Sequence, residues 1–328
     1  MSEIQLNYRL IKILKKILPL IGISIFFYLI ISIGPGKILS TFLEIPSFIF
    51  ILIAAFIIIR ILLNNYIWQL ILRKQKISIG YIKSLKILLI GSFYGYITPG
   101  GFGTFAKVLY LKEETKEPTG KLFINLFAKS AIDALSYYLI IIVAAFIFVK
   151  QYPETFLLVL LYVSFSTSLF LYFVKKERGE KTFNLLIKYF VPKKLKDYLT
   201  RLSKTFYNDF PRIRDFILPF ILCVFVQIII YTQLYIVALS LEIEIPFLIF
   251  IVLYTIASII AIIPISIGGL GTRETALVLL FTPFGVAADK IVALSLANYI
   301  LSVLLLGLSG FILALMYARN NKKLLKQE

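Results

Sequence analysis

The sequence predicts an all-α integral membrane protein with about six full spans and two re-entrant helical hairpins, or about eight hydrophobic helices. Of its 328 residues, 60% are apolar and only 16% are charged, and the mean hydropathy is +0.92. A soluble domain of this size does not carry so much apolar sequence without aggregating. Apolar stretches of membrane-spanning length recur along the chain, and two others are interrupted by proline and glycine clusters.

The charged and reactive residues exclude several classes of function. Lys and Arg number 35 against 17 Asp and Glu, a formal charge of +18, and in so apolar a chain this excess indicates cytoplasmic loops rather than nucleic-acid binding. A single cysteine, Cys223, and no histidine rule out a disulfide framework, a Cys/His zinc site and a nucleophile activated by histidine. We therefore expect no cofactor, no metal site and no enzyme activity.

Crossing about 30 Å of hydrocarbon takes roughly 20 helical residues. Six stretches meet this length, near residues 17–33, 45–63, 128–149, 156–174, 216–240 and 291–316. The basic residues before the first stretch resemble a signal peptide, but no convincing cleavage site follows, so an uncleaved span is predicted. Two further apolar stretches run into Pro/Gly clusters and are followed by short apolar pieces, which gives the candidate hairpins 84–111 and 247–283.

The distribution of basic residues predicts the orientation of these segments, because cationic loops resist translocation. With a cytoplasmic N-terminus, 29 of the 35 Lys and Arg fall on one side. Hairpin 84–111 must then enter and leave from the cytoplasm, and hairpin 247–283 from outside. If both crossed fully, either the basic segment 107–121 or the basic C-terminal tail would lie on the wrong face. We expect a multi-pass protein of the cell membrane with both termini cytoplasmic.

A basic linker divides the predicted membrane halves 1–174 and 216–328. Residues 175–215 contain twelve Lys and Arg and five Asp and Glu. Apolar residues recur at helical spacing within it, which favours an amphipathic helix on an anionic leaflet; they are Leu195, Leu199, Leu202 and Phe206.

The tips of the two hairpins carry the same motif. Each follows a proline, Pro99 or Pro264, and the aligned residues are Gly100-Gly101-Phe102-Gly103-Thr104 and Gly268-Gly269-Leu270-Gly271-Thr272. Two hairpins that enter the membrane from opposite sides and share a tip sequence are typical of an inverted-topology repeat. In such repeats the broken helices meet around a substrate near the midplane. Irregular backbone at that depth must be buried in protein or line a wet cavity. Close packing of helices on glycine is the simpler explanation of either cluster alone.

The glycine tips also predict a ligand chemistry. A half-helix that begins at such a tip points unpaired N–H groups and a positive dipole end into the cavity, which suits an anion such as a lipid phosphate. Thr104 and Thr272 are placed either to donate to that phosphate or to cap the half-helices, which is the commoner role.

Ionisable residues at membrane depth are costly, so each is a candidate site residue. We expect Arg273 to bind a phosphate and Glu274 to hold Arg273 when the site is empty; alternatively, each pairs with another element to hold the hairpin. Lys107 contacts a headgroup or extends to the cytoplasmic surface. Asp133 lies four residues after Lys129, so a local ion pair is the default, and proton or substrate coupling is the alternative.

The stretch Pro264 to Glu274, PISIGGLGTRE, resembles the signature of the lysylphosphatidylglycerol synthase transmembrane-region family, which is related to the flippase half of multiple peptide resistance factor. The first tip resembles the family's other motif, a proline-glycine turn followed by Gly-Glu-x-x-Arg, with Thr104 in the acidic position and Lys107 in the arginine position. The loss of that carboxylate argues against a charge-pair mechanism at the first tip. The resemblance covers essentially the whole chain, and the length suits a form without the soluble aminoacyl-transferase domain.

The resemblance implies lipid handling without lysyl transfer. The leading hypothesis is a lipid flippase or scramblase that moves a phosphate-bearing polar lipid, which is anionic, aminoacylated or polyprenyl-linked, between leaflets. One alternative is a small-solute transporter with Asp133 or Glu274 as proton carrier. Another is a non-transporting scaffold that recruits a separate lipid synthase or glycosyltransferase through residues 175–215.

Overall fold

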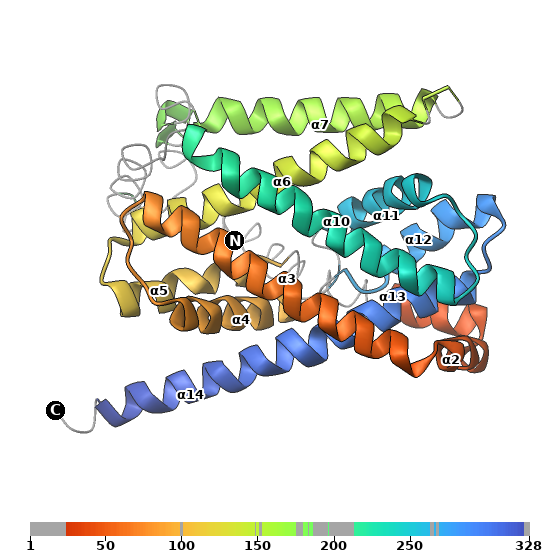
Figure 1. The fold of residues 1–328 in the computed structure, drawn as a ribbon, viewed down its shortest axis with the longest axis horizontal. Coiled ribbons are helices and arrows are strands. Elements are labelled where there is room, and N and C mark those ends of the chain that lie inside the picture. Colours follow the sequence, from red (N-terminus) through yellow and green to blue (C-terminus); the bar gives the residue numbers. More distant parts are fainter. Residues whose placement is uncertain are drawn as a thin grey trace, which may run out of the picture. The chain divides into compact units, whose positions relative to one another are not determined.

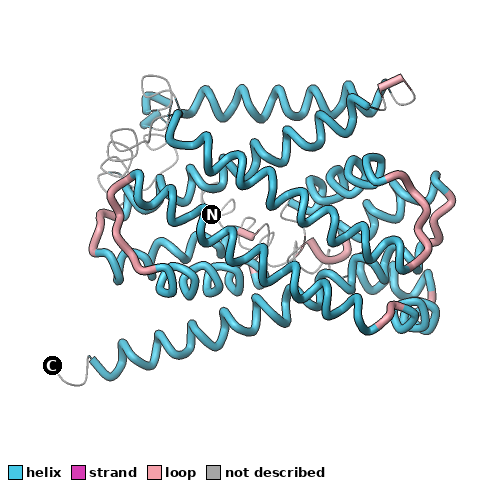
Figure 2. Tube along the Cα trace, viewed as in Figure 1, coloured by secondary structure: helices cyan, strands magenta, loops and turns pink. Residues whose placement is uncertain are grey.

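The structure is a computed structural model, and it describes residues 24–98, 101–147, 149–150, 153–174, 180–182, 184–185, 196, 213–262, 266 and 269–324. No β-strand occurs in this part of the chain, and short loops join the helices (Figure 2). The α-helices after Ser24–Ile33 are α2 Pro35–Glu44, α3 Ser47–Lys74, α4 Tyr81–Ile97, α5 Lys107–Thr115, α6 Thr119–Ile147, α7 Pro153–Val174, α10 Ile217–Ser240, α11 Phe247–Ile262, α12 Thr272–Phe281, α13 Ala288–Ser302 and α14 Leu308–Leu324. Short 3₁₀ turns occupy Phe102–Ala106, Ile213–Phe216 and Thr282–Phe284, and a π-helical turn, Val303–Gly307, joins α13 to α14.

Within the described residues, four helices are long and apolar enough to cross a membrane, namely Ser47–Lys74, Thr119–Phe146, Arg214–Ser240 and Ala288–Arg319. The pair Ser24–Ile33 and α2, bent by 81°, would give a fifth span. A Gly34 with φ of 101° and Pro35 at the first helical position cause this bend, because neither continues the preceding helix. The remaining predicted span, 156–174, lies within the 22-residue helix α7. The fold is therefore that of an all-α, multi-pass membrane protein, as the sequence predicts.

Two spans are longer than the hydropathy predicts. Helix α3 continues past residue 63 to Lys74, and α6 begins at Thr119 rather than near residue 128. Hydropathy ends a span where polar residues begin, but several of these residues are buried and hydrogen-bonded. Trp68 Nε1 donates to Asn125 Oδ1 at 2.7 Å, and Gln69 Nε2 donates to the Ser84 hydroxyl at 2.8 Å. Buried polar side chains with such partners are tolerated inside a helical bundle.

The chain forms two compact units, each assembled from separate stretches. Unit 1 comprises residues 1–58, 88–104 and 230–328, and unit 2 comprises residues 59–87 and 105–229. The four boundaries fall within α3, α4, the 3₁₀ turn Phe102–Ala106 and α10. Each unit draws on both sides of the predicted linker 175–215, which lies mostly outside the described residues, so the organisation into two membrane halves remains a prediction.

Unit 1 is organised around α13. Helix α2 packs against α13 (Figure 1), and the Thr41 hydroxyl donates to Asp289 Oδ2 at 2.9 Å while Lys37 pairs with the same carboxylate at 3.1 Å. Helix α12 packs against both α11 and α13. The short apolar helices α11 and α12 therefore form a helical hairpin over the predicted range 247–283, although the side from which it enters the membrane stays a prediction.

In unit 2, α6 packs against both α5 and α7. Helix α7 turns back along α6 after a short connection, and the two are visible as the yellow-green pair in Figure 1. Polar bonds join α3 to its neighbours in this unit: Asn65 Nδ2 donates to the Tyr81 carbonyl at 3.0 Å, and Asn125 Nδ2 donates to Gln75 Oε1 at 2.6 Å.

Candidate functional site

The second glycine tip needs glycine for two different reasons. Gly269 and Gly271 have φ of 78° and 84°, a region that residues with a Cβ rarely adopt. A Cβ on Gly269 would also lie 2.9 Å from the Cβ of Ala261 in α11, closer than two methyl groups can approach. The tip is thus a tight left-handed turn packed against the preceding helix. Gly268 and Pro264 lie outside the described residues.

The turn starts α12 and places Glu274 under it. Gly271 is the N-cap, and its N–H donates to Glu274 Oε2 at 2.7 Å, so the acidic side chain satisfies an N–H group that the helix leaves free. The Thr272 hydroxyl donates to the Gly269 carbonyl at 3.1 Å and lies 2.9 Å from the Ser266 hydroxyl. Thr272 therefore stabilises the turn, and Gly271 rather than Thr272 occupies the cap position.

Arg273 and Glu274 form an ion pair next to the tip. Glu274 Oε1 accepts hydrogen bonds from Arg273 Nη2 at 2.8 Å, Arg273 Nε at 3.1 Å and the Ser295 hydroxyl at 2.6 Å. The Glu274 side chain is fully buried, while that of Arg273 is 14% exposed. Sequence neighbours on a helix do not normally face each other; here the carboxylate folds back to the cap, and the guanidinium follows it.

An aromatic ring covers the guanidinium. The Arg273 Cζ atom lies 5.3 Å from the centre of the Tyr299 ring, and Tyr299 makes an edge-on contact with Tyr96 of α4, with ring centres 6.3 Å apart. This cation–π contact adds a stabilising interaction for Arg273 that does not use its N–H groups. In the part of the chain that the structure describes, the Nε and Nη2 groups donate to Glu274 and Ser295, and Nη1 donates to no residue. The N–H groups of Nη1 can therefore donate to an additional oxygen ligand.

The first tip has the same glycines but a different local structure. Gly101 has φ of 70°, and a Cβ on Gly103 would lie 2.1 Å from the Tyr94 carbonyl oxygen, so this glycine permits a close approach to α4. The Gly103 N–H donates to Thr98 Oγ1 at 2.7 Å, and the Thr104 N–H donates to the Gly101 carbonyl at 3.0 Å. The chain continues as a 3₁₀ turn and has no charged residue before Lys107. Pro99 and Gly100 lie outside the described residues.

Lys107 and Asp133 belong to another cluster, in unit 2. The Lys107 ammonium lies 5.4 Å from the centre of the Trp68 ring. Asp133 pairs with Lys129, which confirms the ion pair predicted from their spacing. Lys129 also donates to Asn64 Oδ1 at 3.1 Å, and the thiol of Cys223 donates to Asp133 Oδ1 at 3.2 Å. The predicted charged site residues thus lie in two places, Arg273 and Glu274 in unit 1 and Lys107 and Asp133 in unit 2.

Several residues of these clusters were not predicted from the sequence. Ser295 and Tyr299 bind Glu274 and Arg273, respectively, and they recur four residues apart on α13. Polar residues at this spacing within a predicted span mark one face of a helix, and this periodicity could have identified them. Trp68, the single tryptophan of the chain, carries no comparable signal, because its contact with Lys107 joins residues far apart in sequence.

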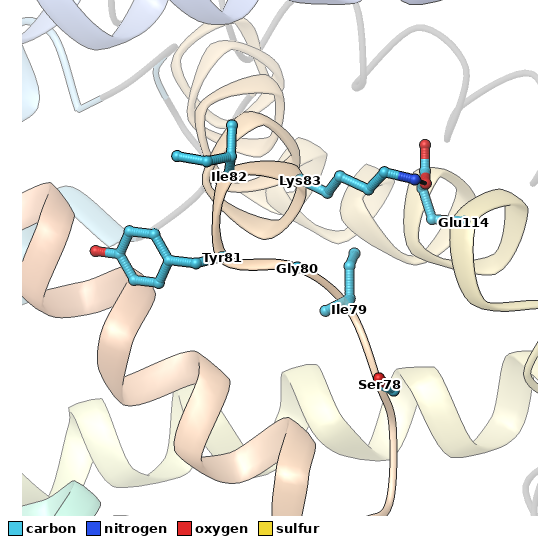
Figure 3. Close-up of a pocket in the computed structure, with 7 residues that line it drawn as sticks. All are labelled: Ser78, Ile79, Gly80, Tyr81, Ile82, Lys83 and Glu114. Atoms are coloured by element: carbon cyan, nitrogen blue, oxygen red, sulfur yellow. Dashed lines mark hydrogen bonds and ion pairs between the residues drawn. The ribbon is translucent and has the colours of Figure 1, made fainter.

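A surface hollow in unit 2 contains none of the predicted residues. It has a volume of about 410 Å³, and the Lys83 ammonium reaches across to Glu114 at 2.8 Å (Figure 3). Its lining residues are Ser78, Ile79, Gly80, Tyr81, Ile82, Lys83 and Glu114. Among the residues that the structure describes, no three Cys, Asp or Glu residues gather in a group that could hold a metal ion.

Comparisons with known proteins identify the family of this chain. The model of the lysylphosphatidylglycerol synthase transmembrane region matches residues 17–310. A UPF0104 membrane protein of Methanothermobacter thermautotrophicus is 30% identical over 37% of this chain and 35% of its own length. A UPF0104 membrane protein of Methanocaldococcus jannaschii is 23% identical over 95% of this chain and 98% of its own length.

No solved structure matches the chain. The family match covers both glycine tips, Arg273 and Lys107, and it supports a membrane-lipid-related role. The chain belongs to the lysylphosphatidylglycerol synthase transmembrane-region family.

Proposed function

We propose that this protein moves a phosphate-bearing polar lipid between the leaflets of the cell membrane, with Arg273 as the phosphate ligand and with both termini in the cytoplasm. The headgroup would pass along the protein while the acyl or polyprenyl chains stay in the bilayer. The proposal rests on a largely buried guanidinium at a glycine turn. The carboxylate paired with it also accepts hydrogen bonds from other groups. In this proposal the protein transports lipid and catalyses no covalent step.

The bonding of Glu274 supports an exchange of partners. Its carboxylate also accepts the Gly271 N–H and the Ser295 hydroxyl, so it keeps two hydrogen bonds if Arg273 turns to a phosphate. A buried carboxylate without such donors would hold the arginine far more strongly, because its desolvation would be uncompensated. Glu274 would therefore hold Arg273 in the empty site and release it to the headgroup.

The charges of the pair favour some headgroups over others. Arg273 and Glu274 together are neutral, so a headgroup with only a phosphate adds one uncompensated negative charge to the site. A headgroup that also contains an ammonium group offers a partner for Glu274 when Arg273 binds the phosphate. Aminoacylated and zwitterionic phospholipids meet this condition, and we expect them to be transported faster than anionic lipids with uncharged headgroups.

The test is translocation of headgroup-labelled lipids in liposomes that contain the purified protein, with a quencher outside. Aminoacylated, zwitterionic and anionic lipids are compared. We expect fast protein-dependent quenching that Arg273→Ala reduces at least tenfold and Arg273→Lys restores in part. Arg60, which lies in α3 of unit 2, is the control, and Arg60→Ala should have little effect. The double variant Arg273→Ala/Glu274→Gln, which leaves no unpaired buried charge, separates loss of the ligand from loss of the fold. Equal effects of Arg273→Ala and Arg60→Ala would refute the site.

A second candidate function rests on Asp133. Its side chain is 43% exposed although it pairs with the nearly buried Lys129, so this carboxylate is the accessible member of the pair. A proton-coupled transporter of small solutes would use it as the proton carrier. Uptake of protons into liposomes that depends on a solute, and that Asp133→Asn abolishes, would support this alternative over lipid translocation.

We also propose that the protein can recruit a partner enzyme through the linker. The net positive linker 175–215 offers a surface for an acidic partner such as a separately encoded lipid synthase or glycosyltransferase. Co-purification of such an enzyme, without translocation by the isolated protein, would support a scaffold over a transporter.

A further inference from the structure

Positive charge exceeds negative charge at one place in unit 2. Lys107 at the start of α5 and Lys129 in α6 lie close enough to interact electrostatically, and Asp133 is the carboxylate that acts on both. Two ammonium groups and one carboxylate leave a net charge of +1. In a membrane bundle a net charge is costly unless a counter-ion or a ligand compensates it.

The two lysines differ in how they are satisfied. Lys129 is bound by Asp133 and by Asn64 Oδ1 at 3.1 Å, and the Cys223 sulfur lies 3.9 Å away. Lys107 has the ring of Trp68 beneath its ammonium. Among the described residues, no carboxylate or other hydrogen-bond acceptor reaches the Lys107 ammonium. A cation–π contact leaves the N–H groups of an ammonium free to donate.

The aromatic surface below Lys107 is held rigidly. Trp68 is 1% exposed, and its Nε1 donates to Asn125 Oδ1 at 2.7 Å. Asn125 in turn donates to Gln75 Oε1 at 2.6 Å. A ring fixed by buried hydrogen bonds keeps the ammonium in one place before any ligand arrives, and such preorganisation lowers the entropic cost of binding.

We propose that Lys107, supported by Trp68 and by the Lys129–Asp133 pair, forms a binding site for one phosphate group that carries a single negative charge. The Lys107 N–H groups donate to the phosphate oxygens, and the ligand neutralises the net charge of the cluster. Asp133 repels a second negative charge, so the site favours a phosphodiester over a phosphomonoester, which carries between one and two negative charges at neutral pH. This site goes beyond the proposed function, because it uses none of the residues bonded to Arg273 and does not depend on transport.

The protein contains its own reporter for this site. Trp68 is the only tryptophan and contacts the proposed ligand-binding group, so its fluorescence should change when an anion draws the ammonium away from the ring. The experiment is a titration of the full-length protein in neutral detergent with short-chain phosphatidylglycerol, a phosphodiester. Short-chain phosphatidic acid, the uncharged diacylglycerol and inorganic phosphate are titrated in parallel.

We expect a saturable change with phosphatidylglycerol, weaker binding of phosphatidic acid and no change with diacylglycerol. Lys107→Gln should weaken phosphatidylglycerol binding about tenfold or more, and Lys107→Arg should retain it. Lys83→Gln, which removes a surface lysine from the same unit, serves as the matched control and should bind normally. Binding of inorganic phosphate as tight as that of phosphatidylglycerol, still dependent on Lys107, would support a phosphate site at Lys107 but would overturn its preference for a single negative charge, because inorganic phosphate carries between one and two negative charges at neutral pH.

Unchanged affinity in folded Lys107→Gln, or no fluorescence response to any anion, would overturn the proposal. Binding of phosphatidic acid as tight as that of phosphatidylglycerol would overturn the selection of a single charge by Asp133. Arg273→Ala is expected to leave this titration unchanged even though it lowers translocation. Failure of the Lys107 site and failure of the proposed lipid transport are therefore distinguishable.

Discussion

Replacing Glu274 with glutamine removes one charge from the buried pair at the second tip and barely changes its shape. The glutamine keeps one acceptor oxygen for the four donor contacts that the carboxylate oxygens receive from Gly271, Ser295 and Arg273. Arg273, whose side chain is only 14% exposed, loses its counter-charge. Breaking a buried ion pair by removing one partner costs about 3–5 kcal/mol, and we expect the lower end, about 3 kcal/mol, because Arg273 keeps its contacts with Ser295 and Tyr299.

The matched control is Glu242→Gln. Glu242 pairs with Lys290 at 3.0 Å, but its side chain is 84% exposed, and surface pairs contribute about 0–1 kcal/mol. Reversible unfolding in mixed micelles, followed by circular dichroism, measures the loss in free energy of unfolding for both variants. The double variant Arg273→Gln/Glu274→Gln should recover part of the stability, because no unpaired charge remains. Losses that agree within about 0.5 kcal/mol, the usual range for surface changes, would refute the assignment of Glu274 as the buried partner of Arg273.

Two further predictions concern packing. In Gly310→Ala, the new Cβ would lie 2.1 Å from the Leu89 carbonyl oxygen, so α14 must move away from α4 at a cost of about 1–3 kcal/mol in the free energy of unfolding. The control is Gly307→Ala, whose new Cβ would have its nearest neighbour at 3.5 Å. Equal thermal stability of the two variants would contradict the close contact of Gly310 with Leu89. Asn125→Leu leaves the buried Trp68 N–H without its acceptor, which costs about 1–3 kcal/mol; the tryptophan emission should also shift, and an unchanged spectrum would argue against the bond.

Hydropathy located the helices but not their ends. The predicted spans end where polar residues begin, as at residue 63, whereas α3 runs on to Lys74. The polar residues in this extension have partners on α4 and α6, and a local hydropathy window cannot detect such partners. The hairpin 247–283 was predictable because its proline and glycine cluster interrupts an apolar stretch, and α11 and α12 do pack against each other there.

At the sites too, contacts between residues close in sequence were predictable, and contacts between residues far apart in sequence were not. The i,i+4 spacing of Lys129 and Asp133 was sufficient to predict their ion pair. The sequence predicted that Glu274 holds Arg273, but their adjacency did not give the geometry of the bond, which depends on the carboxylate turning back to the Gly271 N–H. The contact between Lys107 and Trp68 joins α5 to α3, and no local pattern encodes it.

The sequence by itself determined that this chain is a multi-pass helical membrane protein, that two glycine tips interrupt its helices and that it belongs to its family. These properties follow from composition, local spacing and motif, which need no knowledge of distant contacts. Only the tertiary structure decided what surrounds the charges at the two sites, with Glu274 under the second tip and Lys107 on the ring of Trp68. The cost of a buried charge depends on what surrounds it in space, and that environment is assembled from helices far apart in the sequence.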